Sequence, residues 1–145
     1  MSDIQTVHGL WQKACALHLK GLDFCEKFTL EQMAESFNGC GPEWMSSRCR
    51  SVLDMIFGDF APCFLLHDVQ WAHSHGTDEF FRWSNECLRD NCLLVADALY
   101  PWWRPRRYVR RHQARLIYEL CKDFGKVAYN EAYFASATMV KAPSK

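Results

Sequence analysis

The chain has 145 residues, of which 49% are hydrophobic, and its 17 Lys and Arg residues balance 17 Asp and Glu residues. A chain of this length and apolar content is expected to form one domain, residues 1–145, around a core of its own. Its formal net charge of zero excludes a general electrostatic attraction to nucleic acid, so we expect no nucleic-acid partner. No stretch approaches the ~20 apolar residues that a membrane span needs.

The N-terminus and the cysteines bear on the cellular compartment. Residues 1–5 lack the basic start and apolar run of a secretory signal peptide, which predicts a cytoplasmic location or export by a non-classical route. The eight cysteines would form disulfides in a secreted protein and stay reduced in the cytoplasm. Because none of them forms a Cys-x-x-Cys pair, we expect no structural zinc site.

Apolar residues recur at helical intervals along most of the chain and no segment alternates as a strand would, which predicts an all-α fold. Thr29 begins a capping box, so a short helix should start there. Asp59 and Thr77 are expected to cap two later helices, which should form an antiparallel hairpin. The expected helices cover residues 2–20, 29–37, about 49–58, 61–71, 78–98 and 106–137.

Two features stand out as chemistry-bearing. The first is the loop Asn38-Gly39-Cys40-Gly41-Pro42, whose glycines and proline end the preceding helix. The second is the pair His67-Asp68 within an apolar helix. His67 and Asp68 point about 100° apart around the helix axis, so the histidine can accept a proton while the aspartate binds a cation. The alternative is a half-buried, hydrogen-bonded histidine beside a solvated acid.

Three segments in this order, Asn38–Pro42, Cys63–Asp68 and Asp78–Phe81, resemble the calcium-dependent phospholipase A2 superfamily, and most closely its atypical members with a Gly-Cys-Gly-Pro-like loop. The resemblance covers about Phe37 to Leu88. It implies an all-α, phospholipase A2-like antiparallel helix hairpin with added N- and C-terminal helices, and a bacterial or phage-encoded protein.

The resemblance also implies a mechanism. His67 would be the general base that activates a water, and Asp78 would orient its imidazole. Asp68 would hold Ca²⁺ together with the loop at Asn38, Gly39 and Gly41, because this hard ion prefers oxygen ligands. A loop amide at Gly41 would then help to stabilise the oxyanion.

The sequence departs from the family at three points. Trp71 stands where the family usually has a tyrosine, and offers only an indole N–H. Only 11 positions separate His67 from Asp78 (78 − 67 = 11). If the first helix of the hairpin ran to Ser74, Asn85 would lie level with His67 instead. By the resemblance, Cys63 would bridge to Cys87, although a reduced pair packed as small hydrophobic side chains is equally open.

A basic and aromatic stretch precedes the last helix. Its residues with the makeup of an interfacial membrane anchor are Trp102, Trp103, Arg104, Arg106 and Arg107. The alternative is that the tryptophans pack in the core and the arginines are only solvated.

The first hypothesis for function is therefore calcium-dependent hydrolysis of phospholipid acyl esters at a membrane surface. The second is a catalytically degenerate phospholipase A2-like scaffold that acts as a structural or interaction module. A metal-dependent phosphohydrolase of the His-Asp type ranks last, because the only upstream histidines, His8 and His18, lie in a packing helix.

Overall fold

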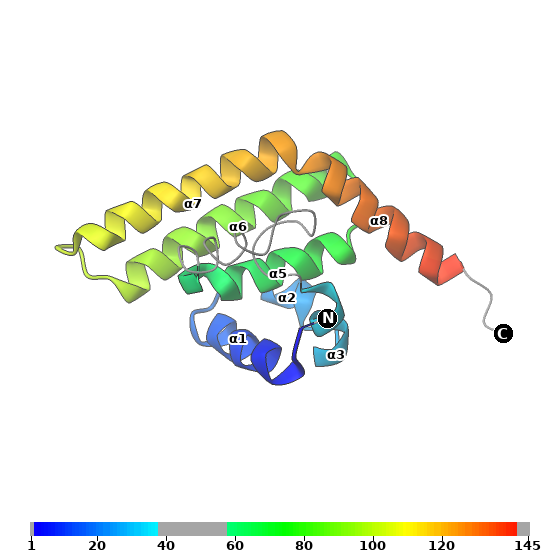
Figure 1. Ribbon diagram of the computed structural model, residues 1–145, viewed down its shortest axis with the longest axis horizontal. Helices are drawn as coiled ribbons and strands as arrows, with labels where there is room; N and C mark the ends of the chain where they lie inside the picture. Colours follow the sequence, from blue (N-terminus) through cyan, green and yellow to red (C-terminus); the bar gives the residue numbers. More distant parts are fainter. Residues whose placement is uncertain (1, 38–57, 142–145) are drawn as a thin grey trace.

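The computed structural model describes residues 2–37 and 58–141, and these form helices and connecting turns without any strand, which confirms the all-α prediction (Figure 1). The helices are α1 (Ile4–Ala16), α2 (Leu22–Cys25), α3 (Leu30–Ser36), the short 3₁₀ helix η1 (Gly58–Phe60), α5 (Ala61–Ala72), α6 (Asp78–Leu99), α7 (Pro105–Phe124) and α8 (Lys126–Lys141). In this part of the chain, no helix combines the length and the apolar character needed to cross a membrane.

The N-terminal part is a group of short helices that covers one side of α5. Asp3 caps α1 by accepting a hydrogen bond from the backbone N–H of Thr6 at 3.0 Å. The helix ends at Ala16, earlier than the predicted Lys20, because His18 takes a left-handed conformation with φ of 52°. The capping box predicted at Thr29 is confirmed at the start of α3, with both reciprocal hydrogen bonds present.

Helices α5 and α6 lie side by side and run in opposite directions, joined by a turn at residues 73–77 (Figure 1). The hydroxyl of Thr77 caps α6 as predicted, accepting from the N–H of Phe80 at 3.1 Å. The predicted cap at Asp59 is wrong, since α5 follows directly on η1 and Phe60 occupies its N-cap. The Asp59 carboxylate accepts hydrogen bonds from Tyr100 Oη at 2.5 Å and Arg110 Nε at 3.0 Å, which ties η1 to the α6–α7 corner.

The single closing helix predicted for residues 106–137 is two helices, α7 and α8, which meet at Gly125. A Cβ atom at Gly125 would lie 2.5 Å from the carbonyl oxygen of Cys121 and 2.7 Å from the Trp71 ring. Only glycine therefore allows the chain to turn this close to α5. Helix α7 packs along α6, and Asp97 of α6 holds it through Arg107 and Arg111 at 3.0 and 2.7 Å.

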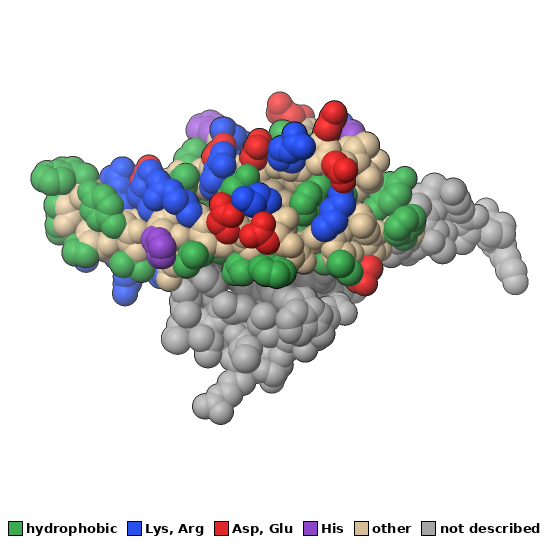
Figure 2. Space-filling model, turned by 90° about the horizontal axis from the view of Figure 1, so that it is seen from above, with side chains coloured by type: hydrophobic (Ala, Val, Ile, Leu, Met, Phe, Trp, Pro, Cys, Tyr) green, Lys and Arg blue, Asp and Glu red, His purple; other side chains and the backbone are tan. Residues whose placement is uncertain are grey.

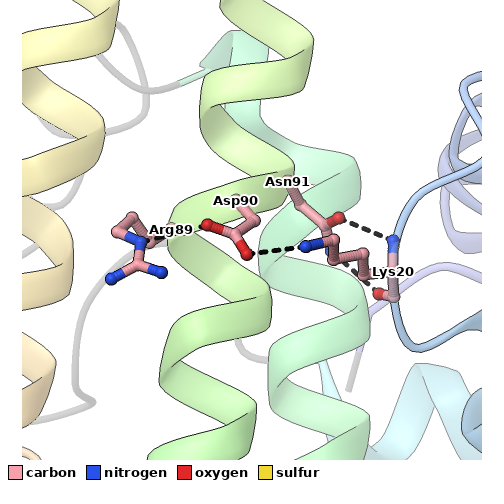
Figure 3. Close-up of polar contacts among 4 residues, drawn as sticks. All are labelled: Lys20, Arg89, Asp90 and Asn91. Carbon is pink, nitrogen blue, oxygen red and sulfur yellow. Dashed lines mark hydrogen bonds and ion pairs between the residues drawn. The ribbon is translucent and has the colours of Figure 1, made fainter.

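Buried polar residues of α6 fix it to the N-terminal part. The side chain of Asn91 accepts from the backbone N–H of Lys20 at 2.7 Å and donates to the carbonyl of the same residue at 2.9 Å (Figure 3). At the surface beside it, Asp90 pairs with Lys20 Nζ at 2.8 Å and with Arg89 Nε at 3.0 Å. After α1 ends, the backbone N–H and carbonyl of Lys20 have no partner within a helix, and the amide of Asn91 supplies both hydrogen bonds. Asn91 therefore fixes the turn that leads into α2.

Candidate functional site

The candidate site is centred on His67, which α5 carries into the interface with α6. Its side chain is buried, with 5% of the residue exposed. Nε2 of His67 lies 2.9 Å from Oδ1 of Asn85, which is buried on α6. An amide oxygen only accepts hydrogen bonds, so in this geometry Nε2 carries the proton and Nδ1 keeps the lone pair.

Burial also sets the charge of His67. Desolvation lowers the pKa of its imidazole to about 4, and the hydrogen bond that the ring donates to Asn85 offsets only part of this effect. The ring is therefore neutral at pH 7. A neutral imidazole with its lone pair on Nδ1 is the form that accepts a proton from water.

The predicted partner, Asp78, lies elsewhere. It begins α6, its side chain is exposed, and it pairs with Lys126 of α8, whose ammonium group lowers the pKa of the carboxyl. The reason is that Asp78 is the first residue of α6, directly after the turn, whereas His67 lies five residues before the end of α5 (72 − 67 = 5). Asp78 precedes Asn85 by seven residues (85 − 78 = 7), about 10 Å along the helix axis at ~1.5 Å per residue. The structure thus replaces the expected His67–Asp78 pair with His67–Asn85.

Trp71 encloses the histidine. Its ring centroid lies 4.4 Å from that of His67, and it also contacts the buried Tyr129 of α8 at 5.7 Å. The indole N–H donates to Oγ of Ser84 at 2.9 Å, and this hydroxyl donates in turn to the carbonyl of Phe81. The indole therefore supports α6 through a serine and contributes packing, but no hydrogen bond, to His67.

Cys63 lies one helical turn before His67 and is buried as a reduced thiol. Cys87 is also buried and reduced, so the bridge that the resemblance implies is not formed here. Burial raises the pKa of the Cys87 thiol to about 11, which keeps it protonated and unreactive at neutral pH. Both cysteines pack as small hydrophobic side chains.

Of the four residues implied for calcium, the structure describes only Asp68. Asp68 is half-buried on α5 and lies near Cys121 of α7. Burial, and to a smaller extent the negative charge of Asp68, raise the pKa of the Cys121 thiol to about 12. Asn38, Gly39 and Gly41, including the implied oxyanion donor, fall outside the described residues. Within residues 2–37 and 58–141, no three His, Cys, Asp or Glu side chains are grouped to hold a metal ion. Asp68 alone does not make a calcium site.

A cavity of about 460 Å³ opens between α6, α7 and α8 beside Asn85. The residues that line it are Asp78, Phe81, Arg82, Asn85, Tyr118, Lys122 and Lys126. Asn85 is 1% exposed, and its Nδ2 atom has no hydrogen-bond partner. The amide therefore connects the histidine on one side with a cavity rich in cations on the other. Sequence reasoning missed this cavity, although Tyr118, Lys122 and Lys126 recur every four residues and such spacing places side chains on one side of a helix.

The basic and aromatic stretch lies at the α6–α7 corner. Figure 2 shows hydrophobic side chains gathered at this end of the molecule, next to a row of Lys and Arg along α7. Trp102 and Trp103 are 73% and 61% exposed, so the alternative that they pack in the core is wrong. Arg104 lies over the ring of Trp103, at 5.2 Å from its centroid, and Arg106 is exposed. Arg107 differs, because it is half-buried and bound to Asp97.

No family model, curated protein or solved structure matches this chain. The features of the molecule that bear on function are a buried neutral histidine, an asparagine that fixes its tautomer, and two exposed tryptophans at one corner.

Proposed function

We propose that this protein hydrolyses acyl esters of phospholipids with a water that His67 activates, on a phospholipase A2-like hairpin of α5 and α6. The observation that carries the proposal is the 2.9 Å hydrogen bond between His67 Nε2 and Asn85 Oδ1. It holds the imidazole in one tautomer and one orientation, as the asparagine of Cys-His-Asn proteases does for their histidine.

In the proposed reaction, a water oxygen attacks the ester carbonyl carbon while Nδ1 of His67 takes the water proton. The tetrahedral intermediate then breaks its bond to the alcohol oxygen, and the imidazolium returns the proton to that leaving group. The products are a fatty acid and a lysophospholipid. Asn85 stays hydrogen-bonded to the ring throughout. Because its amide is neutral, it stabilises the imidazolium less than a carboxylate would.

Calcium remains part of the proposal through Asp68, with Asn38, Gly39 and Gly41 as the further ligands. When bound, Ca²⁺ would polarise the ester carbonyl as a Lewis acid. The steps assigned above to His67 and Asn85 are independent of it.

A lipid surface is the proposed partner. Support comes from the exposed rings of Trp102 and Trp103 beside Arg104 and Arg106. Indole rings favour the head-group region and each nearby cation adds about 1 kcal/mol of attraction to anionic lipid.

The second candidate is a catalytically degenerate scaffold of the same type. Two observations favour it: a neutral amide contacts the histidine, and burial leaves that ring a weak base. A scaffold would bind calcium without turnover.

Fatty-acid release from vesicles of anionic phospholipid, in calcium and in EDTA, tests the proposal. Hydrolysis that requires calcium supports the enzyme and its metal. A calcium-dependent rise in melting temperature without any release selects the scaffold. Fatty-acid release that is equal in calcium and in EDTA is consistent with His67 as the base and shows that calcium has no part in the reaction. An Asp68→Ala variant provides the matched control, because it should lose any calcium effect while the His67–Asn85 bond stays intact.

A further inference from the structure

Helix α7 has two apolar faces, and the fold uses one of them. Ala114 and Ile117 are buried against the rest of the protein. A second face, about a third of a turn away, carries Val109, Leu116, Leu120 and Phe124, which are between 48% and 77% exposed. Their spacings of seven, four and four residues place them in one continuous row, which we call the α7 stripe. Four large apolar side chains in a row on a surface mark an interaction site.

Charge is distributed unevenly along this helix. The N-terminal third and the residue before it carry Arg104, Arg106, Arg107, Arg110 and Arg111. The C-terminal third carries the acidic residues Glu119 and Asp123 with one cation, Lys122, which pairs with Glu119 at 2.8 Å. Two copies of α7 in parallel would bring the arginines together. Two antiparallel copies would place the basic end of each opposite the acidic end of the other, which also aligns the helix dipoles favourably.

The α7 stripe is complementary to a second copy of itself when the two helices run in opposite directions. With the two-fold axis between Ala114 and Arg115, Val109 lies opposite the partner's Leu120. In the same register Gln113 lies opposite the partner's Leu116, and Arg106 opposite the partner's Asp123. Both Arg106 and Asp123 are exposed, and the described residues give neither an ion pair within the chain. With Gln113 included, the positions from Val109 to Leu120 advance by four, three and four residues, the spacing that paired helices bury.

We propose that the protein forms a two-fold symmetric dimer in which the α7 stripes of two copies pack antiparallel. Each contact then occurs twice, as an isologous interface requires. The stripe fits a second copy better than a lipid surface, because Glu119 and Asp123 flank it and anionic lipid would repel them. The proposal is independent of the esterase function.

Sedimentation velocity on the full chain, from sub-micromolar to sub-millimolar concentration, tests the dimer. We expect the mass to rise from 17.0 kDa towards twice that value as concentration increases. Leu116→Glu and Leu120→Glu should each give a monomer at all concentrations with an unchanged circular dichroism spectrum. Ile4→Glu is the matched control, because Ile4 is similarly exposed but lies on α1, and it should leave the dimer intact.

A charge exchange tests the register. Arg106→Asp and Asp123→Arg should each raise the dimer dissociation constant about tenfold, since each puts like charges opposite one another at both ends. The double variant should recover the original value within about threefold. A wild type that stays monomeric, or that binds vesicles through the stripe instead of pairing, overturns the dimer. A double variant no tighter than the single ones overturns the antiparallel register.

Discussion

The imidazole of His67 on α5 is bonded to the amide of Asn85 on α6, at 2.9 Å between Nε2 and Oδ1. This contact crosses the hairpin at the point where a hydrolase of the proposed type needs an orienting group. The side chain found there is neutral. Asp78, the acid that the sequence predicts as the partner of His67, is instead bound to Lys126 at the surface. The chemistry of the site therefore depends on how well an amide replaces a carboxylate.

Restoring a carboxylate at this position should strengthen the base. In Asn85→Asp, a negative charge within hydrogen-bond distance should raise the pKa of His67 from about 4 by roughly 1–3 pH units. The rate of ester hydrolysis should rise with it, because the imidazolium that forms during the reaction is better stabilised. An NMR titration of the ring gives the pKa. Asn85→Leu serves as the control, since it removes the bond without adding charge and should slow the reaction.

The stability of the protein should decrease in mild acid because of His67. Its pKa is about 4 in the folded state and about 6.5 in an unfolded chain, so the unfolded state binds more protons below pH 6.5. The free energy of unfolding should fall by on the order of 3 kcal/mol between about pH 6.5 and pH 4, and His67 adds no further loss below that.

Urea unfolding at a series of pH values measures this dependence, and His67→Gln should flatten it. Some slope should remain, because burial also lowers the pKa of the half-buried His73. The carboxyl groups of Asp59 and Asp90, whose pKa values are lowered, act in a separate window, since their contribution is lost only as pH falls below about 4. An equal slope in wild type and His67→Gln would show that the ring is solvated in the folded protein.

The turn between α7 and α8 should not accept any side chain. Gly125→Ala places a methyl group 2.5 Å from the Cys121 carbonyl oxygen, so we expect a loss of about 1–3 kcal/mol in the free energy of unfolding. Gly9→Ala is the matched control, because a Cβ at Gly9 in α1 meets nothing within 4 Å. That substitution should raise stability by about 0.5–1 kcal/mol through its better helix propensity. If both variants behaved alike in thermal unfolding, the close approach of Gly125 to Trp71 would be wrong.

Local signals were sufficient to predict most of the helices. The capping box at Thr29 and the cap at Thr77 are satisfied by residues three positions away, so the sequence alone determines them. Asp59 has the same chemistry, yet its carboxylate is used by Tyr100 and Arg110, more than 40 positions distant. Gly125 was overlooked for the same reason, since the need for glycine comes from Trp71 on another helix.

The candidate site divides in the same way. The apolar spacing along the helix places His67 on the same face as its apolar neighbours, and the structure buries the ring more fully than the half-buried histidine of the alternative interpretation. The identity of its partner depends on which residue of α6 lies level with His67, and the packing of the two helices against each other decides this. About two helical turns of α6 separate Asp78 from Asn85, and with them a carboxylate from an amide.

The most direct test of the central claim is fatty-acid release from anionic phospholipid vesicles by wild type and by His67→Gln. Glutamine keeps a polar side chain of similar reach but cannot accept and return a proton. We predict measurable release by the wild type and a loss of about 10²–10⁴-fold in the variant, with an unchanged melting profile at pH 7. Equal release by the two proteins would contradict the assignment of His67 as the base.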